Sequence, residues 1–298
     1  MDFLRTRLIS DLTSATEART LDLPTNPISH LILSISGYNV TDEATLAEIL
    51  AFLNTVLVSR GGVTILNLQS EDLYGLNTYL YRSRPILTQM VATDNAERLL
   101  SLIIPFGRHI MDPNECLPAT PKGELQLTLD LTALGTSIDN GIINLDCVQL
   151  PGATPSKFLK STLKTLSAPG GTGEYFADLP IGNTLLALQL RMTTFPTTSS
   201  HAYGVDALRV LKDEKEVGFS AAGVECLVGE GIFRMGSPGI SIAAQGNLQP
   251  AHIAWVDFDP TSDGRYALDT KGAASLKAGL TYGVNEALYL STFELVNV

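Results

Sequence analysis

Hydrophobic and polar residues alternate along much of the chain. In "GELQLTLDL", Gly123 to Leu131, every second residue from Leu125 onward is leucine and the residues between are polar. Because successive side chains of a strand point to opposite faces, this segment is predicted to be a strand with one buried face. Its predicted core residues are Leu125, Leu127, Leu129 and Leu131, and its predicted outward residues are Glu124, Gln126, Thr128 and Asp130.

Short strand-like segments recur through both halves of the sequence. They are predicted at 28–36, 62–68, 98–106, 124–131, 141–150, 183–195, 205–213, 251–259, 265–270, 274–282 and 287–296. Clusters of Gly, Pro, Asn and Asp separate them, which is typical of an antiparallel all-β protein. The segment 158–183 is ambiguous: apolar residues from Phe158 to Leu166 fit a helix, whereas its Thr and Ser content and its glycine-rich sequel fit a strand and hairpin. We favour a strand.

Two helices are predicted in the first half. In residues 41–59, apolar side chains from Leu46 to Leu57 form one stripe at helical spacing, with Thr41 as the predicted cap. A second helix is predicted to start at Ser70 and to carry the shorter stripe of Leu73, Leu76 and Leu80. Both are expected to cover a sheet face or edge.

A domain boundary is predicted near "LPGATPSK", Leu150 to Lys157, where two prolines and a glycine follow a finished strand. We therefore expect one domain in residues 1–155, containing both helices, and a second in 156–298. The strand-like segments on each side number about as many as one jelly roll contains. The glycine-rich stretches at 168–175 and 229–239 are predicted to be loops.

The composition limits the function. The chain has 298 residues, 45% of them hydrophobic, enough for a large core. Its net charge of −11 and pI of about 4.8 disfavour direct nucleic-acid binding, because the chain repels phosphate. Three scattered cysteines, Cys116, Cys147 and Cys226, do not form a disulfide framework, and we predict buried or half-buried free thiols.

No catalytic, cofactor-binding or metal-ligating residue is nominated, and no cofactor is predicted. The sequence has neither a phosphate-binding G-x-x-x-x-G-K-[ST] loop nor a G-x-S-x-G nucleophile elbow. A metal site clusters its ligands, whereas the four histidines are far apart: His30, His109, His201 and His252.

The stretch "DFDPTSDG" holds Asp257, Asp259 and Asp263, which raises the question of a calcium loop. An EF-hand needs Gly at its sixth position and Glu at its twelfth, and those positions here are Ser262 and Leu268. An aspartate-rich turn is the favoured interpretation.

Three segments resemble the double jelly-roll major capsid proteins of the lineage shared by tailless internal-membrane bacteriophages and adenovirus-like viruses. Residues 102–131 contain a strand that ends in Ile104-Pro105-Phe106-Gly107-Arg108, then a turn at Leu117-Pro118, then the alternating strand from Leu125. Residues 174–194 contain Leu179-Pro180-Ile181-Gly182-Asn183 before a second alternating strand, and residues 255–283 contain strand, acidic turn and strand.

This resemblance implies two jelly rolls side by side, without enzymatic activity. It implies a viral coat protein that forms homotrimeric, pseudo-hexagonal capsomers and tiles an icosahedral shell. Its partners would be itself, minor capsid or vertex proteins and an internal viral membrane, without direct nucleic-acid contact. The expected location is the virion shell, after synthesis in the host cytoplasm. We hypothesise that residues 1–18 form a short amphipathic helix facing inward.

Two alternatives remain open at this stage. A β-sandwich lectin, adhesin or spike that binds glycans or receptors would show the same strand pattern. A jelly-roll glycoside hydrolase would need paired carboxylates, which distant strands can bring together.

Overall fold

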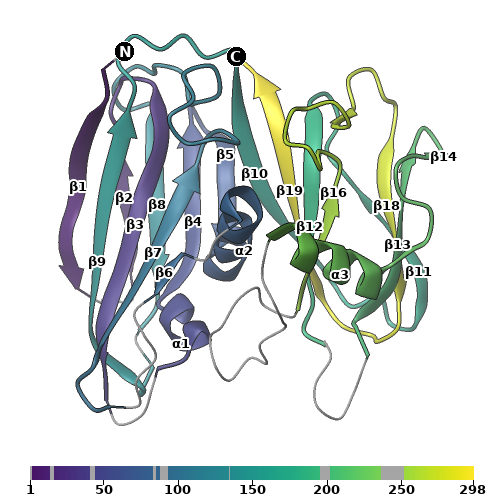
Figure 1. Cartoon of the computed structure of the whole chain (residues 1–298), viewed down its shortest axis with the longest axis horizontal. Coiled ribbons are helices and arrows are strands. Elements are labelled where there is room, and N and C mark those ends of the chain that lie inside the picture. Colours follow the sequence, from purple (N-terminus) through teal and green to yellow (C-terminus); the bar gives the residue numbers. More distant parts are fainter. Residues whose placement is uncertain are drawn as a thin grey trace. The chain divides into compact units, whose positions relative to one another are not determined.

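The computed structural model describes residues 2–13, 17–40, 44–82, 85–87, 93–133, 135–194, 202–235 and 252–298. Strands predominate in this part of the chain, so the predicted all-β class is confirmed (Figure 1). The contacts divide the chain into two compact units. The first holds Met1–Lys160 and the chain end Asn297–Val298, and the second holds most of Ser161–Val296.

One sheet of the first unit has β9 and β3 at its centre. Its strands, in spatial order, are β1 (Leu4–Thr13), β9 (Ile138–Gln149), β3 (Ile28–Asn39), β7 (Glu97–Pro105) and β6 (Ile86–Leu87). All neighbours are antiparallel. Three cross-strand pairs on one face of β3 and β7 are almost fully buried: Leu31 with Ile104, Leu33 with Leu102, and Ile35 with Leu100. Their alternation fixes the register, because a one-residue slip would expose this face.

The other sheet of the first unit contains the strand with four alternating leucines, Leu125–Leu131. Its strands, in spatial order, are β5 (Val63–Gln69), β4 (Leu53–Arg60), β8 (Leu125–Leu131) and β2 (Ala18–Asp22). The four leucines of β8 are all buried, as predicted. On the opposite face, Thr128 shares a 2.8 Å hydroxyl hydrogen bond with Thr20, and Gln126 donates to Asp22.

Two helices belong to the first unit. Helix α1 (Leu46–Ala51) begins with a capping box, in which the Thr45 hydroxyl accepts from the Glu48 N–H and the Glu48 carboxylate accepts from the Thr45 N–H. Helix α2 (Ser70–Tyr81) contacts β7, β4 and β5. The buried Asn77 side chain donates to the Ile103 carbonyl and accepts from the Ile103 N–H, both at 2.7 Å, which holds α2 against β7.

The second unit is also built from two sheets. One contains, in spatial order, β16 (Ile253–Asp257), β12 (Thr184–Arg191), β19 (Leu288–Asn297) and β10 (Lys157–Leu166), with β17 (Leu268–Asp269) also paired to β12. Strand β10 begins in the first unit and ends in the second. Residues 158–166 lie in β10, so the strand favoured for this part of 158–183 is confirmed.

The other sheet of the second unit ends at β11. Its strands, in spatial order, are β11 (Gly173–Asp178), β18 (Leu276–Tyr282), β13 (Val205–Lys212) and β14 (Lys215–Glu216), with β15 (Ala222–Gly223) also paired to β13. Helix α3 (Val224–Met235) packs on β16 and β13. Buried side chains from both sheets, including Leu188, Leu208 and Leu280, join in one apolar cluster.

The helix predicted over 41–59 is wrong in its second half. Helix α1 ends at Ala51, and β4 starts at Leu53. A register shift between Leu53 and Thr55, where β4 pairs with β8, adds one residue and so places Leu53 and Val56 on the same buried side. The bulge thus gives the buried residues of this strand the sequence spacing that is typical of a helix. The predicted cap Thr41 lies outside the described residues, and Thr45 caps α1 instead.

The amphipathic helix hypothesised for residues 1–18 is also wrong. Residues Leu4–Thr13 form β1 and pair with β9. Its arginines alternate onto one face, where Arg5 and Arg7 both bind the carboxylate of Asp146. The pairing partner is far away in the sequence, so the local pattern does not reveal the strand.

The loop predicted at 229–239 is only in part described, and its described portion is helical. Residues 229–235 belong to the last turns of α3, and residues 236–239 lie outside the described part of the chain. Apolar positions of α3 such as Leu227 and Val228 are buried. Tertiary burial therefore outweighs the low helix propensity of Gly229 and Gly231.

Candidate functional site

Strand β11 exposes two consecutive aromatic side chains at a sheet edge. Tyr175 is 37% and Phe176 is 51% exposed. Among the described strands, β11 pairs only with β18. Because side chains alternate along a strand, the two rings lie on opposite faces of the sheet. This edge of the second unit is the candidate functional site.

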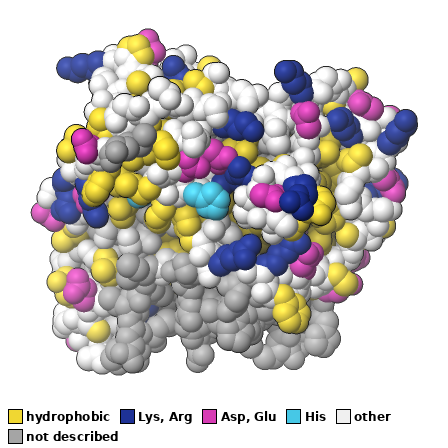
Figure 2. Space-filling model, turned by 45° about the horizontal axis from the view of Figure 1, so that its top comes forward, with side chains coloured by type: hydrophobic (Ala, Val, Ile, Leu, Met, Phe, Trp, Pro, Cys, Tyr) yellow, Lys and Arg dark blue, Asp and Glu magenta, His cyan; other side chains and the backbone are white. Residues whose placement is uncertain are grey.

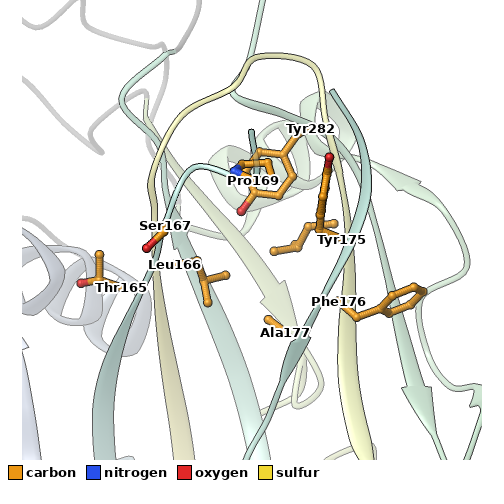
Figure 3. A pocket seen from close by; sticks show the side chains of 9 residues that line it. Thr165, Leu166, Ser167, Pro169, Tyr175, Phe176, Ala177 and Tyr282 are labelled. Atoms are coloured by element: carbon orange, nitrogen blue, oxygen red, sulfur yellow. The ribbon is translucent and has the colours of Figure 1, made fainter. Parts of the chain in front are cut away.

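The inner face of β11 lines a cavity of about 280 Å³ (Figure 3). The cavity is lined by Thr165, Leu166, Ser167, Pro169, Tyr175, Phe176, Ala177, Leu280 and Tyr282. These residues come from the end of β10, the loop that follows it, β11 and β18. Since β10 and β11 belong to opposite sheets, the cavity lies at the margin of the sandwich, where the sheet ends at β11.

Two tyrosines form one wall of this cavity. The rings of Tyr175 and Tyr282 meet edge to face, with centroids 5.7 Å apart, and Figure 3 shows them at the same end of the cavity. Tyr282 is buried. Burial, followed by the nearby charge of Glu286, raises the pKa of Tyr282, so its hydroxyl stays neutral. The wall therefore consists of two aromatic rings, and the Tyr282 hydroxyl on it is uncharged.

The outer face of β11 carries Phe176 within a charged cluster. Figure 3 shows its ring pointing away from the two tyrosines. Phe176 and Arg209 both pair across strands with Gly279, whose missing side chain leaves room between them. The Arg209 guanidinium lies 5.4 Å from the Phe176 ring centroid and forms two 2.6 Å hydrogen bonds with Glu174. The hydrogen bond from Arg209 to Glu174 is the main reason that the pKa of Arg209 is raised.

The loop predicted at 168–175 is confirmed for residues 168–172, whereas residues 173–175 already belong to β11. Gly170 has φ of 89° and Gly173 has φ of 129°, conformations that favour glycine. The Gly170 N–H donates to the Asn285 side chain at 2.9 Å, which holds the loop. The aromatic site itself was missed. The consecutive aromatics of "GEYFAD" were its only local signal, because Leu166 and Tyr282 arrive from distant segments.

The histidines weighed as metal ligands are not brought together. His30 is buried and shares a hydrogen bond with the Ser29 hydroxyl, His109 is exposed, and His252 is half-buried. His201 lies outside the described residues. Within the described ranges, no group of three or more His, Cys, Asp or Glu side chains could hold a metal ion.

The three aspartates of residues 257–263 organise a turn. Asp257 accepts from the Asp259 N–H, Asp259 accepts from the Gly264 N–H, and Asp263 accepts from the Arg265 N–H. Asp257 also pairs with Arg234 of α3. The carboxylate oxygens of these aspartates thus accept hydrogen bonds from main-chain N–H groups, and Asp257 also forms an ion pair, in agreement with the turn interpretation.

The cysteines are free, but the prediction of three covered thiols is wrong for one of them. Cys116 and Cys147 are buried, whereas Cys226 is exposed on α3. Burial raises the pKa of Cys116 to about 11, with a contribution from Asp112, and that of Cys147 to about 12.

No helix in the described part of the chain is long and apolar enough to cross a membrane.

Comparison with known proteins gives a structural answer only. No protein-family model matches the chain, and no curated protein does. Among solved structures, the STIV major capsid protein matches with a TM-score of 0.71 and 13% identity, covering 99% of this chain and 96% of that one. The major capsid protein of bacteriophage PM2 matches with a TM-score of 0.66 and 14% identity, covering 100% and 98%. The PBCV-1 virus capsid matches with a TM-score of 0.60 and 11% identity, covering 99% and 94%.

These structures have in common the double jelly-roll fold, and the likeness extends over almost the whole chain. The predicted fold, two jelly-roll sandwiches with short helices in the N-terminal half, is confirmed, and α3 adds a short helix in the second unit that was not predicted.

Proposed function

We propose that this double jelly-roll chain is the major coat protein of an icosahedral virus. The observation that carries the proposal is the full-length structural match, which includes both sandwiches and reaches a TM-score of 0.71 with a major capsid protein. A match to one sandwich alone would point equally to lectins, enzymes and adhesins, since all of these use single jelly rolls.

The physical character of the chain supports this role. Antiparallel sandwiches with apolar cores make rigid walls, and a shell is held together by many repeats of a few contacts between such walls. On the face seen in Figure 2, basic and acidic side chains are interspersed with apolar ones. A surface with both positive and negative side chains suits specific contact between copies better than a surface of one charge sign, which would repel the same surface of another copy.

The finer parts of the proposal follow from the same assignment. Three copies form a pseudo-hexagonal capsomer, with residues 1–155 and 156–298 contributing one roll each, and capsomers tile the shell. Minor capsid or vertex proteins and an internal membrane are the proposed further partners. The net charge of −11 favours a shell without direct nucleic-acid contact. The chain acts in the virion after synthesis in the host cytoplasm, and it is not an enzyme.

The mass of the purified full-length chain in solution tests the proposal. We expect light scattering and native mass spectrometry to give three times the 31.9 kDa chain mass. A strict monomer at high concentration would contradict the proposal. Binding on a glycan array by such a monomer would favour the alternative of a glycan-binding sandwich.

A further inference from the structure

Two long sheet edges are open among the described strands. Strand β11 pairs only with β18, and β1 pairs only with β9. An open edge presents unpaired N–H and C=O groups and is a template for another strand. The other described sheet ends suit this role less well. β6 and β14 have two residues each, α3 packs on β16, and β2 has no large exposed apolar side chain.

The edge at β11 has two chemically different faces. Its inner face carries Tyr175 and opens on the cavity at the sandwich margin. Its outer face carries Glu174, Phe176 and Asp178, because residues two apart share a face. A strand that lies along β11 would therefore meet a hollow with apolar and hydroxyl-bearing lining residues on the inner side. On the outer side it would meet an aromatic ring flanked by Asp178 and by Glu174, whose carboxylate is also paired with Arg209.

The edge at β1 has the complementary alternation. Arg5 and Arg7 lie on one face, where both bind Asp146, yet their side chains remain 54% and 55% exposed. Leu4 lies on the opposite, inner face and is 47% exposed, and Phe3 just before the strand is 62% exposed. β1 thus offers cations on its outer side and an apolar side chain on its inner side.

We propose that β1 of one copy adds to the edge of β11 in a neighbouring copy. This inference rests on the proposed function and names the surfaces through which the coat protein associates. The outer arginines then face Glu174, Phe176 and Asp178, and Leu4 approaches the cavity beside Tyr175. A register displaced by one residue would place the arginines against the cavity, so the alternation selects between registers.

The proposed contact joins two different surfaces and is therefore heterologous. Each copy gives one edge and receives one, so the contact forms a ring when the rotation between copies closes, as the proposed trimer requires. A symmetric dimer would instead pair like with like, β1 with β1 or β11 with β11. Cross-linking distinguishes the two arrangements.

The first experiment uses single cysteines and a short bis-maleimide linker. All variants carry Cys226→Ser, and the buried Cys116 and Cys147 are retained because their protonated thiols react slowly. We expect linked pairs when Leu4→Cys and Tyr175→Cys chains are co-expressed, and none from either variant alone. One chain carrying both changes should give covalent trimers. Tyr266→Cys, at an aromatic residue that is 59% exposed, replaces Tyr175→Cys as the control and should not link.

The second experiment perturbs the contact. We expect Phe176→Lys to raise the dissociation constant of the trimer at least about tenfold, because it places like charge against Arg5 and Arg7. Tyr266→Lys is the matched control and should leave association unchanged. Thermal unfolding of both variants checks that the fold is retained.

The outcomes separate this inference from the function on which it rests. A wild-type oligomer that shows neither the mixed cross-link nor sensitivity to Phe176→Lys overturns the β1–β11 contact and leaves the coat-protein proposal standing. Linking of either single variant alone would show a symmetric contact and also overturn the inference. A wild-type chain that stays monomeric overturns both.

Discussion

The guanidinium of Arg108 clamps the carboxylate of Glu115 with hydrogen bonds of 2.5 Å and 3.0 Å. The two side chains are only 15% and 9% exposed. Between them in the sequence lies the turn that follows β7, so the pair holds the two ends of this turn together. The turn belongs to residues 102–131, one of the segments that resemble capsid proteins. Charge-assisted, two-point contacts of this kind fix geometry as well as adding stability.

Breaking this pair should destabilise the first unit strongly. We expect Arg108→Met to lower the free energy of unfolding by about 3–5 kcal/mol, because it leaves the Glu115 carboxylate buried without its partner. Urea denaturation measures the change. Lys277→Met, which removes the exposed pair between Lys277 and Glu214, is the control and should have no measurable effect. Equal losses in both variants would contradict the assigned role of burial.

Gly107 should be irreplaceable in the same turn. A Cβ atom at this position would lie 2.0 Å from the carbonyl oxygen of Glu115, and a main-chain atom cannot move aside cheaply. We expect Gly107→Ala to unfold the turn and to lower the yield of soluble protein. Gly135→Ala, where a Cβ would meet no atom within 4 Å, is the matched control. A Gly107→Ala protein as stable as the parent would disprove the close approach.

Asn77 gives a separate prediction about the attachment of α2. Its amide forms both hydrogen bonds with the main chain of Ile103. Asn77→Leu keeps the volume but leaves a buried N–H and C=O unpaired, so we expect a loss of about 1–3 kcal/mol in the free energy of unfolding. Hydrogen exchange at the Ile103 amide should accelerate. Unchanged exchange there would show that α2 is held by its apolar contacts alone.

The strands that could be predicted from the sequence are those in which buried and exposed residues alternate regularly within the strand itself. β3, β7 and β8 were found because each places buried residues at every second position. The strand β4 was mistaken for helix because its bulge shifts Leu53 into the phase of Val56. A bulge is set by the partner strand β8, and its register cannot be inferred from residues 53–60 alone.

The candidate site was beyond the reach of the sequence for a similar reason. Tyr175 meets Tyr282 only because β11 pairs with β18, whose residues lie about a hundred positions later in the chain. The strand β1 likewise depends on Asp146 as the partner of its arginines. The resemblance to capsid proteins supplied the architecture, but not which sheet edges remain open.

His30 makes stability depend on pH. Burial, aided by the charge of Arg5, lowers the pKa of His30 from 6.5 to about 4 in the folded protein. In the unfolded chain the imidazole returns to a pKa near 6.5. Between these values the unfolded state binds a proton that the native state does not, so stability falls as the pH falls from about 6.5 to about 4. The contribution of one histidine is at most about 1.4 kcal/mol per pH unit.

Replacing the imidazole should flatten this profile. We expect the free energy of unfolding of His30→Gln, measured in urea at several pH values from about 4 to 7.5, to decline less steeply on acidification than that of the parent. Some decline should remain, because burial and the charge of Arg191 lower the pKa of His252 to about 4 as well. His109→Gln controls for loss of an imidazole at an exposed position. If His30→Gln declines as steeply as the parent, protonation of His30 is not what destabilises the fold in acid.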